Sequence, residues 1–475
     1  SCCLCVPAAW TAGLVLLAAN ALLRAPPARL PPPAEAGACS SAAPPAAAAP
    51  AVRQGAEFDV ILYGATGFTG KLAAHYLARA EGGFSYALAG RSKGKLEALA
   101  ADVGKGASGT GPPRKPKGII VADSDDLPAL KAMVRRAKVV LTVVGPYLLY
   151  GSKLVQACVE EAVHYADLSG ESPWHRQVID KHHEAARSNG AKIVLAAGYD
   201  SVPFDVATVL ALRELEKATG KTGGAATVVS AVTSMCGAAS GSTLQAGMQA
   251  QELMVSGQVP AEWDNDPYLL VPNAKCRVDT SVSGWGTHLR KDPLLGMTGV
   301  AHFMAVTNSR IVRRTLELIG RRNVSYSEGL TLGGMRDAAA CFMSFVSSGE
   351  LPLAPPKPGE GPPPSMQLAG YYNVTVAARD DASGQSIRLE GVGFGDPGYR
   401  HTSKLLVEVG LCLAEPSCHR KGAGGGVVTP AGAVDLEQIV ARLRRATHED
   451  GRPLLTYALV GAPGSQTAAG KAVEL

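Results

Sequence analysis

The sequence predicts an α/β protein with a doubly wound parallel sheet and a second, inserted α+β domain. Between residues 58 and 225, short apolar runs alternate with segments of helix-forming residues, which is the pattern of a parallel sheet with crossover helices. Beyond residue 226 the β-type segments alternate in polarity, as in residues 227–233, 278–283, 371–378 and 386–392. This change predicts a mixed or antiparallel sheet. The chain of 475 residues is long enough for two cores.

The first predicted strand, residues 60–63, runs directly into a glycine-rich turn, and a helix is expected over residues 71–79. A dinucleotide pyrophosphate needs this arrangement. The first glycine makes the tight turn, the second lets backbone N–H groups approach the phosphates, and the third lets the helix pack closely on the strand. The spacing is G-x-x-G-x-x-G and not the commoner G-x-G-x-x-G. The expected cofactor-binding residues of the turn are Gly64, Ala65, Thr66, Gly67, Phe68, Thr69 and Gly70.

The end of the second predicted strand, residues 86–89, indicates which dinucleotide binds. An NAD site usually places an acidic residue here to hold the ribose 2′-hydroxyl. This chain carries Arg91 instead, followed by Ser92 and Lys95. A guanidinium can grip a 2′-phosphate through two charged hydrogen bonds, so we expect NADP(H) with these three residues at its phosphate. The alternative is that the basic residues only cap a solvated loop.

Three later strands are expected over residues 118–121, 139–144 and 165–168, and a fourth over residues 193–197, with helices between them. Asp123 follows the first of these strands and could approach the adenine. The continuous apolar run at 139–144 is typical of a central strand buried on both faces. Ligands bind at the carboxyl edge of such sheets, so we assign Val144, Gly145 and Pro146 to the cofactor site.

Composition excludes several classes of function. A net charge of +5, 5% aromatic residues and the absence of a dense basic block argue against nucleic-acid binding. The cysteines lack zinc-ligand spacing, so no metal site is expected. Four of them stand alone in apolar surroundings and are expected to be small core residues in a protein of a reducing compartment. These four are Cys158, Cys236, Cys276 and Cys341.

The N-terminal region, residues 1–52, has the composition of a targeting or anchor segment followed by an Ala/Pro-rich linker. Its apolar run, residues 8–23, is short for a bilayer span. An organellar address, a signal segment and a membrane anchor remain open. We expect the dinucleotide-binding Rossmann domain over residues 53–225, the α+β substrate domain over 226–395, and helices returning to the first domain over 396–475, followed by a tail.

Several blocks of the chain, spread from about residue 58 to residue 445, together match a known family. They are the glycine-rich turn with Ala89-Gly90-Arg91, Gly145-Pro146-Tyr147, residues 164–171, the block GYDSVPFD at 198–205, Gly241–Leu244, Tyr326-Ser327-Glu328-Gly329, residues 395–399 and residues 424–431. With these blocks the sequence resembles the saccharopine dehydrogenase-like oxidoreductases, and within them the branch of trans-acting enoyl reductases. This resemblance implies a Rossmann domain with an inserted α/β substrate domain, and often association with membranes or lipid droplets.

The candidate catalytic residues are Asp200, Ser201 and Tyr147. Asp200 and Ser201 follow a predicted strand, where Asp200 could act as an acid or base and Ser201 could donate a hydrogen bond. Tyr147 is a candidate proton donor, or it forms a wall of the nicotinamide pocket. No tyrosine has a lysine four residues later, which argues against the short-chain reductase mechanism. Asp205 is an alternative helix cap in the same block.

Residues 294–306 are apolar and are followed by Arg310, Arg313, Arg314, Arg321 and Arg322. A membrane interface and a buried helix explain this stretch equally well, and the resemblance favours the membrane. We therefore expect an NADP(H)-dependent oxidoreductase that reduces a C=C or C=N bond of a hydrophobic, lipid-type substrate. The alternative is a catalytically silent nucleotide-binding scaffold or sensor at a membrane or lipid droplet. We also expect the protein to be associated with a membrane or a lipid droplet, whether or not that membrane belongs to an organelle, and not to be secreted. A homodimer is the expected assembly.

Overall fold

A computed structural model describes residues 55–105, 113–238, 248, 252, 256–257, 259–352, 354, 356–357, 359–460 and 473–475. The N-terminal segment 1–52 and the block Gly241–Leu244 lie outside the described residues. Within the described part of the chain, no helix combines the length and the apolar character needed to cross a membrane.

The first sheet has seven strands in the order β13-β6-β5-β4-β1-β2-β3, and every neighbouring pair is parallel. This is the strand order of a Rossmann fold, with the change of direction between β1 and β4. The predicted doubly wound sheet is therefore confirmed. Its strands are β1 (Phe58–Tyr63), β2 (Tyr86–Gly90), β3 (Gly118–Val121), β4 (Ala137–Thr142), β5 (His164–Ala166), β6 (Lys192–Val194) and β13 (Gly426–Val428).

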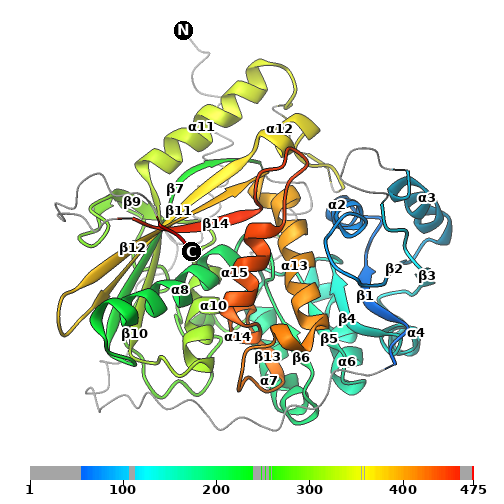
Figure 1. Ribbon diagram of the computed structural model, residues 1–475, viewed down its shortest axis with the longest axis horizontal. Coiled ribbons are helices and arrows are strands. Elements are labelled where there is room, and N and C mark those ends of the chain that lie inside the picture. Colours follow the sequence, from blue (N-terminus) through cyan, green and yellow to red (C-terminus); the bar gives the residue numbers. More distant parts are fainter. Residues whose placement is uncertain are drawn as a thin grey trace.

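Helices cover both faces of this sheet (Figure 1). One face packs against α2 (Phe68–Leu77) and α13 (Thr402–Ala414), and the other against α4 (Leu127–Val134), α6 (Ser152–Glu160) and α7 (Ser172–Asn189). The remaining helices of this lobe are α3 (Lys93–Val103) and the short α5 (Tyr147–Tyr150). Because both faces are covered, the strands are apolar over most of their length, which is why their positions could be predicted.

The second sheet has eight strands in the order β15-β14-β12-β11-β7-β10-β9-β8. Only β7 and β10 run parallel within it, so the predicted mixed sheet is confirmed. Its strands are β7 (Ala226–Cys236), β8 (Arg290–Lys291), β9 (Thr298–Ala301), β10 (Val324–Thr331), β11 (Tyr371–Asp380), β12 (Ser386–Phe394), β14 (Leu455–Val460) and β15 (Val473–Glu474). The helices α10 (Ala305–Leu318), α11 (Leu332–Ser347) and α12 (Pro364–Ala369) belong to the same lobe.

One hydrophobic core joins the two sheets. It runs from Val60 and Leu141 in the first sheet to Val228 and Val376 in the second. Helix α8 (Val202–Thr219), α13 and α15 (Leu436–Arg445) lie between the sheets (Figure 1), and every residue of α13 is buried. The two lobes are therefore packed as one body along this core.

The arginines that follow the apolar stretch do not face a membrane. Arg310, Arg313 and Arg314 on α10 are 2%, 2% and 6% exposed. Arg313 Nε donates to Asp279 Oδ2 at 2.7 Å, and Arg314 Nη1 donates to the carbonyl oxygen of Leu270 at 2.7 Å. The membrane interpretation of these arginines is wrong, because they are buried and donate hydrogen bonds to backbone carbonyl oxygens within residues 263–282.

The hydrogen bonds of Arg313 also explain why one predicted strand is absent. Residues 278–283 form no strand, because Arg313 takes the carbonyl oxygens of Ser281 and Val282. A bent segment whose polar groups bind a side chain cannot also pair with a neighbouring strand. The apolar stretch 294–306 contains strand β9 and the start of α10 and is not one helix.

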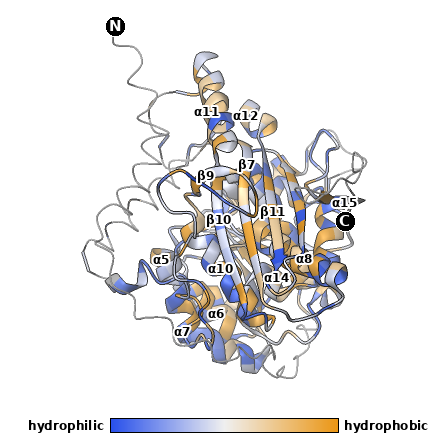
Figure 2. Cartoon of the chain, turned by 90° about the vertical axis from the view of Figure 1, so that its left-hand side faces the viewer, coloured by the Kyte–Doolittle hydropathy of each residue, from blue (hydrophilic) through white to orange (hydrophobic). Residues whose placement is uncertain are grey.

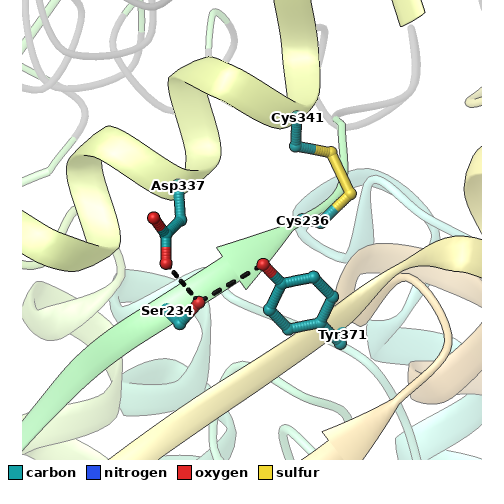
Figure 3. Close-up of a disulfide and its surroundings, with 5 residues drawn as sticks. All are labelled: Ser234, Cys236, Asp337, Cys341 and Tyr371. Carbon is teal, nitrogen blue, oxygen red and sulfur yellow. Dashed lines mark hydrogen bonds between the residues drawn. A yellow bond between two sulfur atoms is a disulfide. The ribbon is translucent and has the colours of Figure 1, made fainter. Parts of the chain in front are cut away.

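Two of the cysteines form a disulfide. Cys236 at the end of β7 and Cys341 on α11 are bonded across a sequence separation of 105 residues (Figure 3). Cys276 is disulfide-bonded as well. The prediction that Cys236, Cys276 and Cys341 are lone core residues is therefore wrong, and the expectation of a reducing compartment loses that support. The bond ties down a helix that projects from the body (Figures 1 and 2) and whose only buried residue is Gly334. Cys158 is buried and free, as predicted.

Candidate active site

The glycine-rich turn has the geometry that its sequence predicts. Gly64 has a φ of +84°, which an L side chain rarely adopts. A Cβ at Gly70 would lie 2.2 Å from the carbonyl oxygen of Gly64, so only glycine allows α2 to approach β1. Helix α2 begins at Phe68, with Gly67 as an N-cap that has no capping side chain and with no acidic residue in the first turn. The free N–H groups at this helix end form a cradle suited to a pyrophosphate.

A second anion-binding feature lies at the end of β2. Arg91 is exposed, and it forms no ion pair with any carboxylate in the described part of the chain. Ser92 is the N-cap of α3, and its hydroxyl caps no helix N–H group. Lys95 is exposed one turn further on. A guanidinium, a free hydroxyl and a helix N-terminus without acidic residues together suit a 2′-phosphate.

Asp123 lies beside the same edge. Its carboxylate accepts the Asp125 N–H at 2.9 Å. Burial raises the pKa of Tyr63, at the end of β1, to about 12, with Asp123 raising it and Arg91 lowering it. Asp123 and Arg91 are therefore both within electrostatic reach of one hydroxyl, as expected if they flank the adenosine part of a dinucleotide.

The segment after β4 borders the glycine-rich turn, because β4 lies beside β1 at the point where the strand order changes direction. Val144 packs against the glycine-rich turn, since a Cβ at Gly64 would lie 2.6 Å from its Cγ2. Gly145 and Pro146 follow, and the Glu171 carboxylate fixes this segment by accepting the N–H groups of Tyr147 at 2.8 Å and Leu148 at 2.7 Å. Glu171 therefore caps α5 and not its own helix.

Tyr147 does not point into an open site. Its ring is buried, its hydroxyl donates to the carbonyl oxygen of Thr142 at 3.2 Å, and it accepts the Leu168 N–H at 3.1 Å. Burial and the nearby Asp167 hold its pKa well above the usual range. This geometry favours a wall of the pocket over a proton donor.

Asp200 and Ser201 stand between β6 and α8, at the same carboxyl edge as the glycine-rich turn. Asp200 is partly exposed. Burial raises its pKa to about 6; His302 lowers it and Glu328 raises it. Ser201 is buried, and its hydroxyl donates to Asn308 Oδ1 at 3.4 Å. Among the predicted catalytic residues, Asp200 is therefore the titratable group that lies at the carboxyl edge of the first sheet and also interacts electrostatically with residues of the second lobe.

Asp205 does not cap its own helix, because α8 already begins at Val202. Its side chain is fully buried, and Oδ2 accepts the N–H of Ala431 at 2.8 Å. It therefore anchors the segment after β13, which is a structural role.

The sequence analysis missed a buried pair next to Asp200. His302 Nδ1 lies 3.1 Å from Glu328 Oε1, and both side chains are fully buried. Asn308 Nδ2 donates to Glu328 Oε1 at 2.9 Å, and the Tyr326 hydroxyl donates to Oε2 at 3.0 Å. Nε2 of His302 has no hydrogen-bond partner in the described part of the chain. The only sequence signal was an acidic residue at an inward-facing position of a strand.

The start of α10 brings this pair to the cofactor edge. The Thr307 hydroxyl donates to the carbonyl oxygen of Gly170 at 2.8 Å, and Met304 Cε would lie 3.3 Å from a Cβ at Gly170. Gly170 follows β5, whose carboxyl end belongs to the same edge as those of β4 and β6. The start of α10, which follows His302, therefore contacts the carboxyl edge of the first sheet.

This edge, built on a Rossmann sheet and covered by a second lobe, defines a dinucleotide-dependent oxidoreductase. Residues 60–194 match the family model "Saccharopine dehydrogenase NADP binding domain". A Mycobacterium tuberculosis protein, provisionally named a trans-acting enoyl reductase, is 36% identical over 404 residues that cover 80% of this chain and 93% of the relative. The trans-acting enoyl reductase of Mycobacterium leprae is 33% identical over 415 residues, covering 82% and 96%.

The chain belongs to the saccharopine dehydrogenase-like family, in the branch of the trans-acting enoyl reductases, and is an NADP-dependent oxidoreductase. The predicted resemblance is confirmed. A solved apo saccharopine dehydrogenase (L-Glu forming) of Saccharomyces cerevisiae aligns with a TM-score of 0.46 and 12% identity, over 85% of this chain and 100% of that chain.

Proposed function

We propose that the protein uses NADPH to reduce a C=C or C=N bond of a hydrophobic substrate. The observation that carries this proposal is Arg91, which is exposed and has no ion-pair partner within the described ranges, beside the N-cap of α3, whose hydroxyl caps no helix N–H group. Both lie at the edge where the glycine-rich turn forms its cradle. The relatives' name, trans-acting enoyl reductase, supports an α,β-unsaturated acyl group as the substrate class. Exposed apolar side chains on the segments at this edge support a hydrophobic substrate; Leu149 is 55% and Phe303 41% exposed.

Bound NADPH would supply a hydride. The chain's own residues would orient it: the N-terminus of α2 holds the pyrophosphate, Arg91, Ser92 and Lys95 hold the 2′-phosphate, Asp123 flanks the adenosine, and Val144, Gly145 and Pro146 border the nicotinamide. Asp200 is the group at this edge that can exchange a proton near neutral pH, since burial raises its pKa to about 6.

The test compares wild type with Arg91→Ala in titrations with NADPH and NADH, followed by single-turnover oxidation of NADPH with a panel of enoyl thioesters, enones and imines. Loss of a bidentate charged contact costs roughly 1.5–3 kcal/mol, so we expect NADPH affinity to fall roughly 10- to 150-fold while NADH affinity stays constant. Arg79→Ala, which removes an exposed arginine at the other end of α2, is the matched control and should change neither.

The same assay separates this proposal from a silent sensor at a membrane or lipid droplet. A sensor would bind NADPH and oxidise it with no member of the panel. Equal losses of NADPH and NADH affinity in Arg91→Ala would contradict the assignment of the 2′-phosphate site.

A further inference from the structure

The chain leaves β6 through an alanine in a conformation that alanine rarely adopts. Ala196 has a φ of +59°, in the left-handed region where a Cβ crowds the carbonyl oxygen that follows it. The residue is buried and stands two positions after the end of β6 at Val194. A residue in this region persists only where its surroundings impose the conformation, and such residues cluster at functional sites. The groups that bind Ala196 therefore show what the fold is fixing here.

One residue imposes this conformation. Asp167, directly after β5, is fully buried, and its Oδ1 accepts the Ala196 N–H at 2.9 Å. Its carbonyl oxygen accepts the Ala197 N–H at 2.7 Å. These two N–H groups belong to the peptide planes on either side of the Ala196 Cα. Because Asp167 binds both planes, it fixes the φ and ψ of Ala196 and the direction in which the chain turns after β6.

The Asp167 carboxylate is itself fixed by neutral groups. Oδ1 accepts the Ser169 N–H at 3.0 Å and the Ser169 hydroxyl at 2.6 Å, and Oδ2 accepts the Tyr165 hydroxyl at 2.8 Å. Burial lowers the pKa of His175 to about 3, so this histidine is neutral. Its Nε2 lies 2.7 Å from Ser169 Oγ and donates to it, because the Ser169 proton points to Asp167. A buried carboxylate with this set of donors is held in one orientation.

The segment that follows Ala196 carries Asp200 to the carboxyl edge of the first sheet. Within this segment, the Tyr199 N–H donates to Thr402 Oγ1 at 2.9 Å, and the carbonyl oxygen of Gly198 accepts the first N–H group of α8 at 2.9 Å. The segment is therefore bound by its backbone at both ends. The position of Asp200 follows from the turn at Ala196 because the residues between them are bound as well.

We propose that Asp167 is a positioning residue: by holding Ala196 in the left-handed conformation, it sets where Asp200 stands at the carboxyl edge. This rests on the proposed function, in which Asp200 is the group that can exchange a proton at this edge. Without the Asp167 carboxylate, alanine at position 196 should leave the left-handed region, whose population is lower by about 5- to 30-fold for an L side chain. Glycine populates that region about as readily as the right-handed one. Loss of the carboxylate should therefore matter little in an Ala196→Gly background.

A double-mutant cycle tests this coupling. The four proteins are the wild type, Asp167→Ala, Ala196→Gly and the double variant, and the measurement is the single-turnover rate constant for reduction of an enoyl thioester at saturating NADPH. A residue that acts only by filling the core lowers the rate equally in both backgrounds. A residue that acts through the conformation of Ala196 lowers the rate only where position 196 carries a side chain.

We expect Asp167→Ala to slow enoyl reduction by about 5- to 30-fold relative to the wild type, because only the molecules with the left-handed turn are competent. The same substitution should slow the Ala196→Gly variant by no more than about twofold. The NADPH dissociation constant, measured by fluorescence titration, should stay unchanged in all four proteins, since the residues assigned to the pyrophosphate and the 2′-phosphate lie at the starts of α2 and α3.

Ala162→Gly is the matched control. Ala162 also has a positive φ, +53°, but it precedes β5 and so lies at the opposite edge of the sheet. Combined with Asp167→Ala, it should restore no activity. Asp167→Asn is the conservative variant. Its amide oxygen can still accept the Ala196 N–H while its amide nitrogen donates to the Tyr165 hydroxyl, so it should keep most of the wild-type rate.

The outcomes separate the two proposals. A wild-type protein that oxidises NADPH with no acceptor overturns the proposed function and, with it, the positioning role. If the wild type is active, a wild-type rate in Asp167→Ala, or equal losses in the two backgrounds, overturns the positioning role alone. If Asp167→Ala loses its native circular dichroism, Asp167→Ser takes its place in the cycle, because its hydroxyl oxygen stands one bond short of the carboxylate oxygens.

Discussion

The glycine-rich turn allows a test in which two neighbouring glycines are required for different physical reasons. At Gly70, a Cβ would lie 2.2 Å from the carbonyl oxygen of Gly64 and 2.8 Å from the backbone of Ala65. Both contacts are with backbone atoms, which cannot rotate away. Gly70→Ala must therefore push α2 away from β1. Overpacking of this kind costs about 1–3 kcal/mol, and we expect a loss of unfolding free energy of about 3 kcal/mol.

Gly67→Ala should behave differently. Gly67 has φ −71° and ψ 171°, which any residue can adopt, and a Cβ would meet its nearest neighbour at 3.4 Å. The unfolding free energy should change by no more than about 0.5 kcal/mol. The added methyl group stands where the backbone at the N-terminus of α2 must approach the pyrophosphate, so NADPH affinity should fall by roughly tenfold or more, about 1.4 kcal/mol.

Gly83→Ala supplies the control. Gly83 lies in the loop before β2, is exposed, has no positive φ, and a Cβ there would meet no atom within 4 Å. Replacing glycine by alanine where the backbone allows it stabilises by roughly 0.4–1 kcal/mol, so this variant should be slightly more stable with unchanged affinity. Urea unfolding followed by circular dichroism and fluorescence titration with NADPH measure the three variants. Wild-type stability in Gly70→Ala, or wild-type affinity in Gly67→Ala, would refute the reasoning.

Two further predictions concern stability. Burial raises the pKa of Asp205 to about 7, above its unfolded value, so its contribution to stability is complete below about pH 4 and is lost as the pH rises through 7. Asp205→Asn should remove that decline, which amounts to about 3 kcal/mol between pH 5 and pH 8, in urea midpoints compared at these two pH values; parallel pH curves for the two proteins would contradict this. Reduction of Cys236–Cys341, or Cys341→Ser, should lower the unfolding free energy by roughly 2–4 kcal/mol with unchanged NADPH affinity; urea curves that coincide with and without reductant would exclude it.

The first lobe could be predicted because its signals are local. Strand β3 occupies the predicted residues, Gly118–Val121, and the turn at Gly64 carries its requirement for glycine in its own sequence. Strand β13, Gly426–Val428, was not predicted. It is short, and it joins the sheet beside β6 from the far end of the chain. A strand of three residues has too little pattern to show where it pairs.

The second lobe depends on contacts that no local pattern contains. His302 stands in a loop without a motif, and its partner Glu328 lies 26 residues further on. Arg313 and Cys341 are similar cases, since their partners Asp279 and Cys236 become neighbours only in the folded chain. A buried charge is costly unless it is paired, so an acidic residue facing inward on a β-type segment signals a hidden partner without identifying it.

The shared core decides how a substrate can reach this site. Helix α8 carries Asp200 and Ser201 before its first turn and packs against β11 and β12, while α10 packs against α8 and contacts Gly170. Lobes that swing about a hinge normally meet through a smaller and more polar interface. Opening these lobes would expose the apolar core that joins the sheets, at about 25 cal/mol for each Å². The distance between Asp200 and His302 is therefore set when the chain folds, and entry must occur through loops at the carboxyl edge, where Leu149 and Phe303 are exposed.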